Sequence, residues 1–140
     1  MNERNMQTFF GKYLQDNLPK ESEAYELKFT KGGAIPFSQI KEHQLDSLKS
    51  AEDEGLYHKI TDQPWLPDRP YSYTLKKPFD CFALAKAKGY VVVWFYKPRE
   101  PKRFIKMRIK DFMRMRKYAK RKSFTEEMAL GVGEEISITV

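Results

Sequence analysis

The run Val91-Val92-Val93-Trp94-Phe95 constrains the fold more than any other feature of this chain, because apolar side chains point to both sides of it. A β-strand alternates its side chains between two faces, so this run has no face that suits water. Strands of this kind lie inside a sheet that is covered on both sides. We therefore expect a strand over residues 90–96 in the centre of a sheet.

Periodicity and turn residues predict the elements of the first half of the chain. Apolar residues three and four positions apart indicate a helix over residues 2–18, and a strand over residues 21–30 follows. A glycine turn then leads to a second helix that starts at its N-cap Ser38, runs to about Asp53 and has Gly55 after its end.

The second half of the chain is richer in strand signals. Strands are predicted over residues 56–60, 79–85 and 103–107, the last of them at a sheet edge, with a tight turn over 86–89. A basic helix is predicted over residues 110–122. A final short helix follows, which opens with a capping box at 123–126 and ends at Gly131. Residues 63–77 combine prolines with aromatic residues and predict an irregular loop near the substrate. The order of elements predicts a mixed α/β (α+β) fold, with one mixed sheet flanked by helices.

Length and composition indicate a soluble globular protein with a single domain over residues 1–140. No apolar run approaches the roughly 18 residues of a membrane span, and the first ten residues are too polar for a signal peptide. We therefore expect a cytoplasmic protein without a membrane partner. Cys81 is the only cysteine, which excludes an internal disulfide and leaves a structural zinc site short of ligands. Any metal should be bound through oxygen.

Positive charge is concentrated in the basic segment, residues 97–122, which holds 13 basic side chains against Glu100 and Asp111. Such a segment suits a polyanion, because lysine and arginine displace the counterions condensed on phosphates. A solvated helix face is the alternative, but interleaved apolar residues tie the segment to the fold and favour nucleic acid. The spacing fits phosphates and not bases, so DNA shape should be recognised. The residues expected to contact DNA are Lys31, His43, Arg103, Lys106, Arg108, Lys110, Arg114, Arg116, Lys117, Lys120 and Arg121.

Glu26-Leu27-Lys28 is the pattern best suited to catalysis, because strand alternation points Glu26 and Lys28 to the same side. A carboxylate can bind Mg²⁺ through oxygen, and an ammonium group nearby can orient water or offset charge on a phosphate. An exposed charge pair on an edge strand is the alternative. The motif Glu-x-Lys recurs at residues 100–102, but only Glu26 lies in a predicted strand that a turn and a helix follow.

Gln44 lies within the apolar stripe of the second predicted helix. It is either a satisfied buried amide, or it faces the site that Glu26 and Lys28 line and holds a phosphate or a metal-bound water.

These residues resemble the PD-(D/E)xK nucleases, most closely the Holliday-junction resolvases of the RecU type. The similarity lies in residues 25–31 and 35–48. It implies a restriction-endonuclease-like fold, a homodimer, and hydrolysis of branched DNA with Mg²⁺, for which Mn²⁺ should substitute. By resemblance Glu26 and the main-chain carbonyl of Leu27 would bind the metal, Lys28 would position or activate the attacking water, and Gln44 would support the site.

The sequence departs from the family pattern because no aspartate precedes Glu26 in a strand. Asp80, at the entrance of the predicted strand 79–85, would replace it if that strand took the usual place of the upstream strand; a turn or cap residue is the alternative. Asp62 is the next candidate. Glu3, on the first predicted helix, and Glu23, on the face opposite Glu26, are weaker. Dimer contacts could involve Phe9, Phe10 and residues 136–140, for which ordinary core packing is the alternative.

Two other functions remain open on the sequence alone. A non-catalytic nucleic-acid-binding module would use the basic segment for phosphates and Trp65, Tyr71 and Tyr73 for stacking. A restriction-type or nicking nuclease on the same fold would differ only in its substrate. The first choice is a Mg²⁺-dependent, structure-selective DNA endonuclease.

Overall fold

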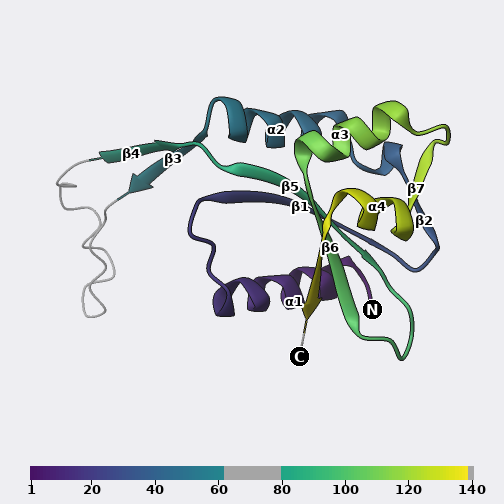
Figure 1. Ribbon diagram of the computed structural model, residues 1–140. Coiled ribbons are helices and arrows are strands. Elements are labelled where there is room, and N and C mark those ends of the chain that lie inside the picture. The colour runs from purple at the N-terminus through teal and green to yellow at the C-terminus, as the bar shows by residue number, and fades with distance from the viewer. Residues whose placement is uncertain (62–79, 139–140) are drawn as a thin grey trace.

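The computed structural model describes residues 1–61 and 80–138, and in residues 56–61 and 80–85 it describes the backbone alone (Figure 1). Its centre is a four-stranded mixed sheet with the order β1-β5-β6-β8. β5 (Lys88–Phe95) is parallel to β1 (Glu23–Thr30) and antiparallel to β6 (Lys102–Arg108), which in turn is antiparallel to β8 (Glu134–Ile138). The mixed α/β fold and the central place of the valine-rich strand are both confirmed.

Helices cover both faces of this sheet and enclose two apolar cores. One core lies under α2 (Glu42–Asp53), α3 (Ile109–Tyr118) and α4 (Glu126–Val132), and it contains Val91 and Val93. The other lies under α1 (Glu3–Asp16) and contains Val92 and Trp94. Figure 1 shows α2 and α3 on one side of the sheet and α1 on the other. The alternation along β5 therefore supplies both cores, and the three consecutive valines are completely buried.

Two small antiparallel pairs complete the fold. β2 (Ala34–Pro36) pairs with β7 (Ser123–Thr125), and the short 3-10 helix η1 (Phe37–Gln39) follows β2. β3 (Leu56–Thr61) pairs with β4 (Asp80–Ala85) in a ribbon that extends away from the main sheet (Figure 1). The predicted hairpin turn over residues 86–89 is wrong, because the chain runs from β4 into β5 and the two strands have different partners.

Several predicted boundaries also need correction. β6 is an inner strand, because β8, which the sequence did not predict, pairs with its second edge. α2 begins at Glu42 and not after Ser38, since the Gln44 side chain accepts the N–H of Lys41 and so caps the helix there. Gly55 has the positive φ of 102° expected after a helix end.

The C-terminal half shows the same kind of difference. α3 ends at Tyr118, short of the predicted residue 122. α4 is capped by Thr125, whose hydroxyl accepts the N–H of Met128, while Ser123 is paired in β7, and the helix continues past Gly131 to Val132. Among the described residues, no helix is both long and apolar enough to cross a membrane.

Candidate active site and basic surface

Glu26 and Lys28 lie side by side on β1, with 3.4 Å between Oε1 of Glu26 and Nζ of Lys28. Their partners across the parallel ladder are Val91 and Val93, which belong to the core under α2, so the pair is on that face of the sheet. Lys28 is the only buried charged residue among those whose side chains are described. β1 is at one end of the sheet, but the pair is not the exposed edge pair that formed the alternative prediction.

Gln44 has a structural role that accounts for its amide oxygen, which accepts the N–H of Lys41 at 2.9 Å. The amide oxygen is satisfied, as in the first of the two alternatives, but Gln44 is half-buried and not buried as that alternative expected. In the described part of the chain no hydrogen bond links Gln44 to Glu26 or Lys28, so its place in the active site stays a prediction.

Asp80 is not in the sheet that holds Glu26. It is the first residue of β4 and is opposite Thr61 of β3, whereas the strand beside β1 is β5. The reason is connectivity: β4 leads into β5, and the first residues of β1 and β5 are already paired, so β4 extends beyond the start of β1 (Figure 1). The prediction that the strand 79–85 lies beside the strand of Glu26 is therefore wrong.

The described residues do not complete the expected magnesium site. They contain no group of three or more histidine, cysteine, aspartate or glutamate side chains able to hold a metal ion. Of the candidate carboxylates, Glu26 and Glu23 both lie on β1 in the main sheet, but on opposite faces of it. Asp62 lies outside the described residues, as does the predicted loop with Trp65, Tyr71 and Tyr73. Metal binding by the main-chain carbonyl of Leu27 stays a prediction.

A second charged cluster occupies the opposite face of β1, as alternation predicts for Glu23. Its carboxylate accepts a hydrogen bond from the Tyr25 hydroxyl and another from Nζ of Lys106 at 2.8 Å. Burial raises the pKa of Glu23, but the hydrogen bonds from Lys106 and Tyr25 outweigh burial, so the net effect lowers this pKa. Burial and the bond to Glu23 raise the pKa of Tyr25. Sequence reasoning missed this cluster, because Lys106 comes from a strand distant in the chain.

The basic segment divides into paired and unpaired side chains. Four of the residues expected to contact DNA form ion pairs within the protein, which leaves them less available to phosphates. These pairs are Lys106 with Glu23 at 2.8 Å, Arg108 with Glu52 at 3.1 Å, Arg103 with Glu135 at 3.7 Å, and Arg116 with Glu42 at 2.6 Å. The other predicted contacts are exposed and have no ion pair to a described residue: Lys31, His43, Lys110, Arg114, Lys117, Lys120 and Arg121.

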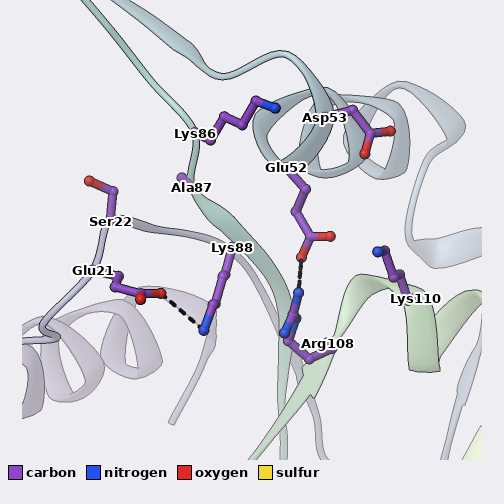
Figure 2. A pocket seen from close by; sticks show the side chains of 9 residues that line it. All are labelled: Glu21, Ser22, Glu52, Asp53, Lys86, Ala87, Lys88, Arg108 and Lys110. Atoms are coloured by element: carbon purple, nitrogen blue, oxygen red, sulfur yellow. Dashed lines mark hydrogen bonds and ion pairs between the residues drawn. The ribbon is translucent and has the colours of Figure 1, made fainter.

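The ion pair between Glu52 and Arg108 lies in a pocket of about 350 Å³ at the start of β5. Figure 2 shows the two side chains facing each other, with Lys86, Lys88 and Lys110 around them. Oε1 of Glu52 also accepts the N–H of Gly89 at 3.0 Å. The Glu52 carboxylate on α2 thus links this helix to β5 through Gly89 and to β6 through Arg108.

The proposed dimer contacts fall largely in the interior. Phe10, Ile136 and Ile138 are buried in the core under α1. Their burial agrees with ordinary core packing, which was the alternative to a dimer contact. Phe9 packs against the same core, with its ring 5.9 Å from that of Trp94.

No protein-family model, curated protein or solved structure matches this chain.

Proposed function

We propose that this protein is a Mg²⁺-dependent, structure-selective DNA endonuclease, and specifically a Holliday-junction resolvase. The observation that carries the proposal is the buried Lys28 beside Glu26 on β1. Removing an ammonium group from water costs free energy, and one partly buried carboxylate at 3.4 Å offsets only part of that cost. The remaining cost indicates that the positive charge of Lys28 has a function, and one such function is to offset the negative charge on a phosphate.

The surroundings of the pair support the resemblance to PD-(D/E)xK nucleases. β1 and β5 are parallel neighbours, and the glutamate and lysine lie on β1; α2 lies between the two strands in the chain, together with β2, η1, β3 and β4. The glutamine of the resemblance lies in the first turn of the connecting helix. Exposed cations on α3 and after it provide a surface for the phosphates of DNA.

Among the described residues, one carboxylate, that of Glu26, is paired with Lys28. Mg²⁺ prefers several oxygen ligands in octahedral geometry, and Glu26 alone does not provide them. The chain's own contribution is that Lys28 can hold a phosphate oxygen or a water next to Glu26. A junction has two symmetric strands to cut, so the proposal includes a homodimer with two such sites.

A cleavage assay tests this function with the purified protein and labelled four-way, flapped and linear DNA, each with Mg²⁺ and with EDTA. We expect cutting of branched DNA that needs Mg²⁺ or Mn²⁺ and that Glu26→Gln abolishes without loss of DNA binding. Glu42→Gln is the matched control, because this glutamate also pairs with a basic residue but is exposed on α2. If Glu26→Gln cuts like the parent protein, the proposed site is wrong.

A non-catalytic nucleic-acid-binding module is the second candidate, and the separation of β4 from β1 favours it. Without a second carboxylate beside Glu26, the pair with Lys28 would be a structural ion pair and the basic surface would be the functional part. Salt-sensitive binding with no cleavage of any of the substrates supports this candidate. Cleavage of linear duplex alone would instead indicate a restriction-type or nicking enzyme.

A further inference from the structure

Tyr118 is the only exposed aromatic residue among those whose side chains are described. It is the last residue of α3 and is 72% exposed. The helix that carries it is firmly placed, because Phe112 and Met115 are buried in the core. The Tyr118 ring is therefore exposed to solvent on a helix that is fixed by its packing.

Tyr118 lines two hollows in the surface. One hollow, of about 520 Å³, is lined by α3 alone and includes Tyr118 and Arg114. The other, of about 420 Å³, includes the same two residues and is closed by Gly131 and Val132 of α4. Both volumes fall within the range of small-ligand sites. A flat group can thus approach the face of the Tyr118 ring that the Lys117 ammonium, 5.5 Å from the ring centre, does not cover.

The charge around Tyr118 is positive. Nζ of Lys117 lies 5.5 Å from the centre of the ring. Arg114 lines both hollows, and Lys120 and Arg121 follow α3 as exposed residues. Asp111 is the only acid that lines either hollow. An occupant should therefore carry negative charge as well as a flat, polarisable face.

We infer that Tyr118 stacks against an unpaired base of single-stranded DNA, while Arg114 and Lys117 contact the neighbouring phosphates. An aromatic ring among basic side chains is the arrangement that binds single strands, because each base can stack on the ring and each phosphodiester linkage carries a negative charge. A duplex is a poorer fit, since its base faces are covered by its own stacking. The inference rests on the proposed function for the choice of DNA, and it predicts that branched DNA with unpaired nucleotides binds more tightly than a fully paired four-way junction.

Fluorescence anisotropy in EDTA tests this without cleavage, using a labelled single strand and a blunt duplex of equal length. Tyr118→Ala should weaken single-strand binding roughly tenfold and change duplex binding less than about twofold, whereas Tyr118→Phe should bind like the parent protein. The salt dependence of single-strand binding should not change, because the ring carries no charge. Leu18→Ala removes a comparably exposed apolar side chain elsewhere and should have no effect.

Unchanged single-strand binding by Tyr118→Ala would overturn the inference, and so would an equal loss for single strand and duplex. Because the residue is exposed at a helix end, the thermal melt of the variant should match that of the parent protein. The readout is independent of Glu26, so a failed nuclease proposal and a failed stacking proposal give different results.

Discussion

Glu52 should be one of the most important charged residues for stability. Its side chain is 8% exposed. Its Oε1 accepts the N–H of Gly89 at 3.0 Å and two guanidinium N–H groups of Arg108, from Nε at 3.2 Å and Nη2 at 3.1 Å. Glu52→Gln keeps an acceptor for Gly89 but removes the charge that Arg108 faces. Glu52→Ala removes both and leaves the buried N–H of Gly89 without its partner.

These contacts set the expected size of the effect. Hydrogen bonds to a charged group contribute about 1.5–3 kcal/mol, but Arg108 is 38% exposed and water screens part of that. We therefore expect Glu52→Gln to lower the free energy of unfolding by about 1–2 kcal/mol. Glu52→Ala adds the cost of an unsatisfied buried N–H, about 1–3 kcal/mol, for a total of about 3 kcal/mol.

Urea unfolding followed by circular dichroism measures both values, provided that the slope of the transition stays the same. The matched control is Glu42→Gln on the same helix, whose carboxylate is 2.6 Å from Arg116 but 71% exposed. An exposed pair contributes about 0–1 kcal/mol, despite its shorter distance. If the Glu42 and Glu52 variants lose the same stability, burial does not decide the strength of these pairs and the reasoning is refuted.

Three further predictions concern Glu23, Gly89 and Gly11. Because the folded-state pKa of Glu23 is lowered from its ordinary value of 4.5, its stabilisation is present above about pH 4.5 and is lost as the pH falls through the lower folded pKa. Urea midpoints measured from about pH 6 to about pH 3 should fall less steeply for Glu23→Gln than for the parent protein, and equal slopes would contradict this. Gly89→Ala should destabilise the protein by about 1–3 kcal/mol, because its new Cβ would lie 2.8 Å from the Leu48 carbonyl oxygen. In the same assay Gly11→Ala, with nothing within 4 Å, should stabilise α1 by about 0.5–1 kcal/mol, and a loss at Gly11 would count against this packing argument.

The sequence predicted the helices and strands that have a local periodic pattern. The apolar run 91–95 determined an inner strand, and the helical spacing of residues 2–18 determined α1, because burial on one or two faces leaves a periodic trace in the chain. Strand partners leave no such trace. β8 has only Ile136 and Ile138 as inward residues, which was too short a pattern to identify the strand that makes β6 internal.

In the candidate site too, features set by local pattern were predictable and features set by strand pairing were not. Alternation was sufficient to place Glu26 and Lys28 together, and Glu23 on the other face. Asp80 was expected near Glu26 because it stands at the entrance of a strand, but no local pattern shows that this strand, β4, pairs with β3 outside the main sheet. The ion pairs of Lys106 and Arg108 join residues 83 and 56 positions apart, so no local pattern could show that these cations are already neutralised.

The parallel pairing of β1 with β5 has a consequence for how the chain folds. β1 ends at Thr30 and its neighbour begins only at Lys88, so the two cannot meet until the intervening residues have been looped out. Closing that loop costs entropy before any contact repays it, and topologies with such distant pairings reach the native state slowly. During synthesis at the ribosome, the strand that carries Glu26 is made early yet must wait for its neighbour, with its apolar side accessible to chaperones in the meantime.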